Sequence, residues 1–152
     1  MKIGVLANPL SRRNRKLLPA IEALLGRYSD VVYARLDRFD ELGRALRQFA
    51  EARIEVLIIS GGDGTIAATL TQIFERDVFA ERPQLAILAG GTSNTIAGDV
   101  GLRGRPLDAL ERCLHAFAHA PETCEVVERN LIRVDYDREK PALCGMFFGT
   151  AA

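Results

Sequence analysis

The sequence predicts an α/β protein with a doubly wound, mostly parallel β-sheet. Continuous apolar runs of strand length alternate with segments whose apolar residues recur at helical spacing. Such runs are typical of strands that are covered on both faces, and short connections join them to the helical segments. Alternating strands and helices of this kind favour crossover connections and a parallel sheet.

Turn residues bound the expected elements. The first apolar run, residues 3–7, stops at Asn8 and Pro9, and Gly26 follows the first helical segment. The predicted strands cover 3–7, 31–33, 56–59 and 85–88. The predicted helices cover 17–25, 40–53, 66–76 and 106–118, and Leu42, Leu46, Phe49, Phe74 and Phe79 are expected in the core.

The pattern changes after Pro121. Residues 126–127, 131–136 and 142–148 resemble consecutive antiparallel strands, and the polar segment 137–140 separates the last two. We therefore expect a nucleotide-binding α/β domain over 1–121, followed over 122–152 by the first strands of an incomplete all-β domain. A single hairpin is only marginally stable, so it would need further strands.

Composition excludes several classes of protein. The 152 residues include 20 Lys and Arg, 20 Asp and Glu, and 48% hydrophobic residues. This apolar content supports a packed core, and the zero net charge predicts no nucleic-acid partner. No apolar run is long enough for a membrane span, and no signal peptide is recognisable. Three irregularly spaced cysteines are typical of reduced thiols, so we expect a cytoplasmic protein.

Three loops follow predicted parallel strands: Asn8-Pro9, residues 61–65 and residues 90–94. Ligands of open α/β sheets bind at these carboxyl ends. The second and third loops are Gly-Gly turns, in which the backbone can approach phosphate oxygens closely and a following helix adds positive potential. The loops also supply hydroxyl and amide groups from Thr65, Thr92, Ser93, Asn8 and Asn94. They predict a phosphorylated ligand.

Asp63 lies inside the second loop, where its carboxylate would repel phosphates. A Mg²⁺ ion would remove the repulsion, since Mg²⁺ binds one or two carboxylates together with phosphate oxygens. A helix cap at the start of the following helix is an equally good interpretation. Neither a Walker A motif nor a dinucleotide G-x-G-x-x-G motif occurs, so the phosphate-binding mode is a different one.

Together, SGGDGT at 60–65, GGTSN at 90–94 and the Asn8-Pro9 pair resemble the catalytic domain of the diacylglycerol kinase family. That family includes bacterial lipid kinases and sphingosine kinases, and it shares GGDGT with NAD kinases. The resemblance implies a Rossmann-like domain followed by a β-sandwich, whose opening strands resemble residues 133–149. It also implies Mg²⁺- and ATP-dependent phosphorylation of a lipid hydroxyl, either diacylglycerol-like or sphingoid.

By the same resemblance, the nucleotide phosphates or their Mg²⁺ contact residues of all three loops. These residues are Asn8, Pro9, Ser11, Arg12, Gly61, Gly62, Asp63, Gly64, Thr65, Gly91, Thr92 and Asn94. Asp63 is the catalytic candidate and acts on Mg²⁺ indirectly. The general base is expected in a carboxyl-terminal part beyond this sequence.

The chain also departs from the family pattern. Arg12 and Arg13 follow Ser11 where the family carries glycine, and one of them is expected to neutralise phosphate charge. Ala67-Ala68 replaces Asn-Glu, and Thr95 replaces Asp. These differences leave two alternatives open: an NAD kinase-like enzyme, and a catalytically silent nucleotide-binding regulatory module.

The expected partner is a lipid substrate of unidentified type, reached through transient contact with the inner membrane face. A homodimer stays open. No apolar pocket for the lipid is evident from the sequence. His115 and His119, with Cys113 nearby, are interpreted as residues of a helix flank rather than zinc ligands, because they form no zinc-binding motif.

Overall fold

The computed structural model describes residues 1–136 and 141–146 and confirms the α/β class. The central sheet consists of β1 (Ile3–Ala7), β2 (Val31–Arg35), β3 (Val56–Gly61) and β4 (Gln84–Ala89). The helices are α1 (Asn14–Leu25), α2 (Leu42–Glu51), α3 (Asp63–Glu75), α4 (Thr95–Val100) and α5 (Pro106–His119), with the short 3-10 helices η1 (Phe39–Glu41) and η2 (Pro121–Thr123).

All four strands are parallel, and their order in the sheet is β2-β1-β3-β4. From β1 the chain moves outward to β2 and then crosses back over β1 to reach β3. The direction of winding therefore reverses between β1 and β3. In open α/β sheets the ligand crevice lies at such a switch point, at the carboxyl ends of the strands.

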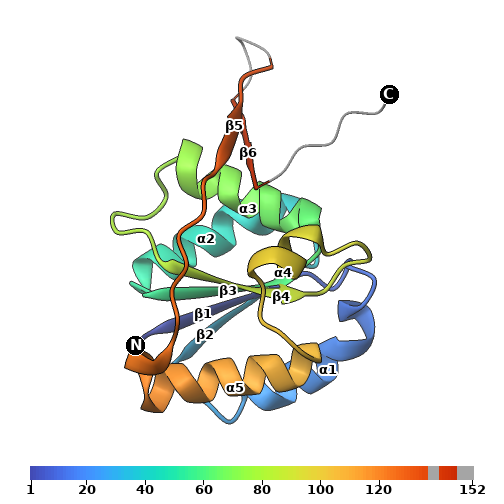
Figure 1. Cartoon of the computed structure of the whole chain (residues 1–152), viewed down its shortest axis with the longest axis vertical. Coiled ribbons are helices and arrows are strands. Elements are labelled where there is room, and N and C mark those ends of the chain that lie inside the picture. The colour runs from blue at the N-terminus through green and yellow to red at the C-terminus, as the bar shows by residue number, and fades with distance from the viewer. Residues whose placement is uncertain (137–140, 147–152) are drawn as a thin grey trace.

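Helices cover both faces of the sheet, as Figure 1 shows: α1 and α5 lie below the strands, and α2 and α3 above them. Alternate strand residues supply the two cores. Val5 and Ile58 pack with α1 and α5, whereas Leu6 and Ile59 pack with α2 and α3. Both cores are fully buried at the central strands, which explains why β1 and β3 are apolar at successive positions.

Several predicted boundaries differ from the structure. Helix α3 begins at Asp63 rather than near residue 66, because Gly62 is extended and serves as its N-cap. The six-residue helix α4 was not predicted, since so short a segment has no clear periodicity. The strand predicted at 126–127 was wrong: both valines are exposed and lie outside the strands.

The predicted antiparallel pair is present as β5 (Ile132–Val134) and β6 (Leu143–Gly145). Residues 137–140 and 147–148 of the predicted hairpin lie outside the described residues. The hairpin packs on α3, where the Cys144 N–H donates to Thr71 Oγ1 at 2.9 Å. Arg133 donates to Glu75 and so lowers the pKa of that carboxyl, which means that the link weakens as pH falls through this lowered value.

Phe49 and Phe39 provide a matched test of the core. Phe49 belongs to α2 and is completely buried, whereas Phe39 is 49% exposed. We expect Phe49→Ala to lower the free energy of unfolding by about 3–5 kcal/mol and Phe39→Ala to change it by less than about 0.5 kcal/mol. Urea unfolding monitored by circular dichroism measures both values. Equal losses in the two variants would contradict this packing.

Candidate functional site

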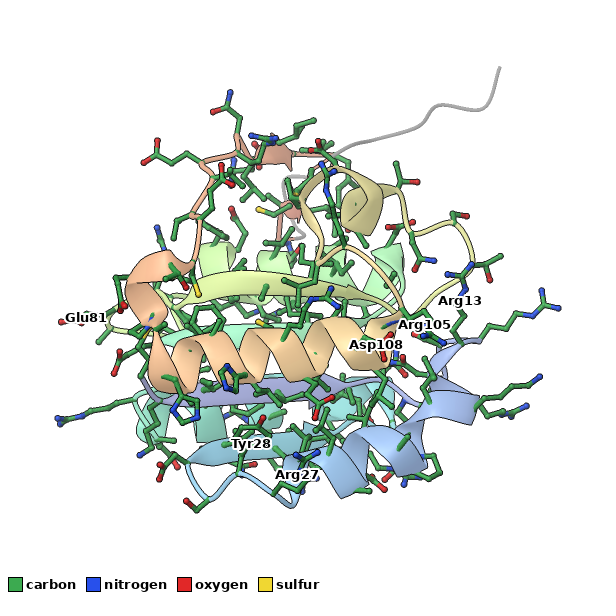
Figure 2. All side chains as sticks on the ribbon, turned by 60° about the horizontal axis from the view of Figure 1, so that its bottom comes forward. Arg13, Arg27, Tyr28, Glu81, Arg105 and Asp108 are labelled. Carbon is green, nitrogen blue, oxygen red and sulfur yellow. The ribbon has the colours of Figure 1, made fainter. Side chains whose placement is uncertain are left out.

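The three predicted loops meet at the carboxyl end of the sheet. The Asn8 N–H donates to the Ser60 carbonyl at 2.9 Å, and the Gly90 N–H donates to the Gly61 carbonyl at 2.9 Å. Each loop is therefore hydrogen-bonded to its neighbour directly beyond the last strand residues. Figure 2 shows Arg13 at this end of the molecule and Glu81 at the other.

The side chain of Asn8 is buried and holds parts of two loops. Its Nδ2 donates to Thr65 Oγ1 at 2.8 Å, and its Oδ1 accepts from the Leu10 N–H at 2.8 Å. Ser11 continues this connection, since its Oγ accepts from the Gly62 N–H at 3.1 Å. The first loop thus supports the second through side chains that the sequence suggested as direct ligand contacts.

The two glycine loops touch through their backbones. A Cβ atom on Gly91 would lie 2.5 Å from Gly62 Cα, and one on Gly62 would lie 3.3 Å from Gly91 Cα. Asn94 closes the third loop in the left-handed conformation, with its Oδ1 accepting from the Gly91 N–H at 2.7 Å. The close approach therefore requires glycine at position 91.

Asp63 links the second loop to the third. Its Oδ2 accepts from the Thr95 N–H and its Oδ1 from the Ile96 N–H, each at 3.1 Å. The carboxylate therefore caps α4, whereas the sequence suggested a cap for the helix that Asp63 itself begins. Because α4 was not predicted, sequence reasoning offered no signal for this role.

Several hydrogen-bond donors remain at the surface of this arrangement. Among the described residues, none accepts from the N–H groups of Asp63, Gly64, Thr92 or Ser93. The first two belong to the first turn of α3, where unsatisfied amides and the helix dipole favour an anion. A hollow of about 340 Å³ lies beside the third loop and is lined by Arg12, Arg13, Lys16, Gly91 and Thr92. This chemistry suits a phosphate group.

Comparison with known proteins identifies the family. The family described as "Diacylglycerol kinase catalytic domain" matches residues 2–126. The chain belongs to this family. The match includes all three loops and the whole parallel sheet.

The curated relatives carry lipid kinase names. A "Probable lipid kinase YegS-like" of Enterobacter sp. (strain 638) is 37% identical over 92 residues, which cover 59% of this chain and 30% of the relative. A protein of the same name from Stenotrophomonas maltophilia (strain K279a) is 34% identical over 101 residues, covering 64% of this chain and 30% of the relative. The chain thus spans about a third of these relatives' length.

Solved structures agree on the fold. A diacylglycerol kinase from Bacillus anthracis strain Sterne superposes with a TM-score of 0.55 at 22% sequence identity, covering 78% of this chain and 40% of that one. A second structure from the same organism has a TM-score of 0.56 over 75% of this chain and 39% of that one. At this identity the likeness concerns the fold alone.

The side chains of the three loops do not form a metal site by themselves. The described residues contain no group of three or more His, Cys, Asp or Glu side chains that could hold a metal. Asp63 is the carboxylate in the glycine loops, and both of its oxygens already accept N–H bonds. Phosphate oxygens and water would therefore have to supply most of the ligands of an ion, as Mg²⁺ commonly requires.

The structure also contains an apolar cavity of about 610 Å³ along β4, which the sequence did not indicate. It is lined by α5, by the outer edge of β4 and by the segment 123–131. No residue of the glycine loops lines it, so it is separate from the site. Cys113 borders this cavity, and burial raises the pKa of its thiol to about 12. His115 and His119 lie on the flank of α5, as the sequence suggested, with their rings tilted by 51° to each other.

Asn14 is a buried residue of the site that was not predicted from the sequence. Asn14 is completely buried and hydrogen-bonds to the ends of β1 and β3. It has the appearance of an ordinary polar residue among the basic residues of the first loop, and only its contacts distinguish it.

Replacing Asp63 tests its link to α4. Asp63→Ala removes both acceptors of the α4 amides, so we expect the free energy of unfolding to fall by about 0.5–2 kcal/mol. Hydrogen exchange at the amides of Thr95 and Ile96 should become faster. Asp99→Ala is the control, because Asp99 belongs to α4 but forms only a surface pair with Arg129. Unchanged exchange in Asp63→Ala would show that the carboxylate is not the cap.

Proposed function

We propose that this chain is the nucleotide-binding part of an ATP-dependent lipid kinase that phosphorylates a lipid hydroxyl. One observation carries the proposal: the two glycine loops pack backbone to backbone, they present N–H groups that have no acceptor among the described residues, and Thr92 of the third loop lines a hollow together with cationic side chains. The family membership supports phosphoryl transfer as the reaction. The names of the relatives support a lipid as the acceptor.

In this proposal, the chain acts mainly by positioning and charge neutralisation, on which phosphoryl transfer depends. The N–H groups of Asp63, Gly64, Thr92 and Ser93 hold phosphate oxygens. Arg12 or Arg13, which stand where the family carries glycine, offsets the negative charge of the phosphates. The loops are held in place by the side chains of Asn8, Ser11 and Asn94. Their amide or hydroxyl groups are already hydrogen-bonded to loop atoms, so they support the loops rather than bind the phosphates.

Mg²⁺, when bound with the nucleotide, would draw negative charge away from the phosphates. Asp63 is the carboxylate placed to influence that ion, through water rather than as a member of a preformed metal site. Asp63 also has a positioning role, because it holds the second loop against the start of α4, directly after the third loop, while the phosphates are bound. A general base for the acceptor hydroxyl is assigned to a part of the protein outside this sequence.

The acceptor lipid would reach the site by transient contact with a membrane surface. None of the helices in the described part of the chain has the length and hydropathy of a membrane span. The apolar cavity along β4 is not proposed as the lipid site, because it does not reach the glycine loops.

A transfer assay separates the three functions considered. Radiolabelled ATP with Mg²⁺ is offered to the full-length native gene product together with diacylglycerol, sphingoid bases or NAD. We expect label in a lipid and none in NAD, whereas this 152-residue chain alone should bind ATP but transfer phosphate poorly. Labelled NAD would favour the NAD kinase alternative, and ATP binding without transfer by the native product would favour a regulatory module.

Two glycines provide the matched control for ATP binding. A Cβ on Gly91 would collide with the backbone of Gly62, whereas a Cβ on Gly98 meets nothing within 4 Å. We expect Gly91→Ala to weaken ATP binding by tenfold or more and Gly98→Ala to leave it unchanged, as measured by isothermal titration calorimetry. If Gly91→Ala binds ATP normally, the packed loops are not the nucleotide site.

The arginines that replace the family's glycine can be tested separately. We expect Arg12→Ala with Arg13→Ala to weaken ATP binding by about tenfold, equivalent to about 1.4 kcal/mol, with a larger loss at low salt. Arg15→Ala with Arg47→Ala removes the same charge from exposed positions that do not border the hollow. Equal affinity in the two double variants would remove Arg12 and Arg13 from the phosphate site.

A further inference from the structure

We propose that Asn14 is a positioning residue that holds all three loops at the spacing needed to bind a nucleotide's phosphates. The inference rests on the proposed function, and it concerns a residue that touches no proposed ligand-binding atom. Asn14 is the first residue of α1 and is completely buried. Its side chain points to the sheet rather than capping its own helix, since α1 has no side-chain cap.

Both N–H donors and the oxygen of the Asn14 amide hydrogen-bond to the ends of neighbouring strands. Its Nδ2 donates to the Asn8 carbonyl at 3.1 Å and to the Ser60 carbonyl at 2.7 Å. Its Oδ1 accepts from Ser60 Oγ at 3.1 Å. The amide therefore joins the ends of β1 and β3 at the switch point of the sheet. A buried amide is costly unless it is paired in this way.

The third loop rests on the same side chain. A Cβ on Gly90 would lie 2.5 Å from Asn14 Oδ1 and 2.8 Å from both Cγ and Nδ2. Gly90 therefore lies directly against the amide plane, and its carbonyl accepts from the Arg13 N–H at 3.0 Å. Asn14 thus limits how closely the third loop can approach the other two.

Each of its contacts leads to a residue of the second or third loop, one residue or one hydrogen bond away. Asn8 holds the Thr65 hydroxyl, Ser60 precedes Gly61, and Gly90 precedes Gly91. A small displacement at Asn14 is consequently transmitted to all three loops. Such a displacement can cost a large factor in a site whose catalysis depends on position.

The first test compares Asn14 with a buried apolar residue of the same helix. The probe is the fluorescent N-methylanthraniloyl derivative of ATP with Mg²⁺, titrated into the 152-residue chain. We expect its dissociation constant to rise tenfold or more in Asn14→Ala and in the isosteric Asn14→Asp, which replaces the donor by an oxygen facing two carbonyls. Ile21→Val and Ile21→Ala, both at a fully buried position, should change it less than twofold even where their melting temperature falls equally. Equal losses at matched stability would overturn the proposal.

A double-mutant cycle with Gly90 provides a readout that a general loss of stability does not. Gly90→Ala alone should weaken binding of the probe, because the new methyl group collides with Asn14. In the Asn14→Ala background that collision is gone, so Gly90→Ala should cause no further loss. Additive losses would show that Asn14 does not set the position of the third loop.

Hydrogen exchange distinguishes failure of this inference from failure of the proposed function. If the wild-type chain binds no probe, the proposed function fails. The loop-positioning role is then tested by the hydrogen-exchange rates of the Arg13 and Gly90 amides. Faster exchange of these amides in Asn14→Ala, but not in Ile21→Val, supports the role. Exchange unchanged from wild type overturns it.

Discussion

The site depends on the contact between two backbone turns. Gly62 and Gly91 approach so closely that no side chain fits on Gly91, and this contact brings the second and third loops together above adjacent strands. Backbone groups are thereby presented at short range from two directions. Loops at the ends of neighbouring parallel strands can form this contact only if both turns leave room for it.

Polar side chains of all three loops stabilise this contact. Asn8 and Ser11 connect the first loop to the second, Asp63 connects the second to α4, and Asn94 closes the third. All these bonds are made within the protein, whereas the N–H groups of Asp63, Gly64, Thr92 and Ser93 have no acceptor among the described residues. The cationic side chains of Arg12 and Arg13 line the hollow beside the third loop. Different atoms of the same loops thus make the internal hydrogen bonds and line the hollow.

Much of this organisation could be predicted because it is local. The apolar runs of β1 and β3 identified buried parallel strands, and the Gly-Gly turns after β3 and β4 identified the edge of the sheet at which the loops meet. Predictions failed where a short segment has no periodicity or where local pattern misleads. Helix α4 depends on Asp63 for its first hydrogen bonds, and Val126 and Val127 have strand-forming side chains but pair with no strand in the described part of the chain.

The fold class, the family resemblance and the three loops follow from the amino-acid order alone, since strand periodicity and turn chemistry are properties of adjacent residues. The roles of individual side chains in these loops follow from the packing of the folded chain. Asp63 caps a helix more than thirty residues away, and Asn14 hydrogen-bonds to Ser60, which lies 46 residues further along the chain. Both roles depend on hydrogen bonds between distant segments, whose proximity is set by the packing of the sheet.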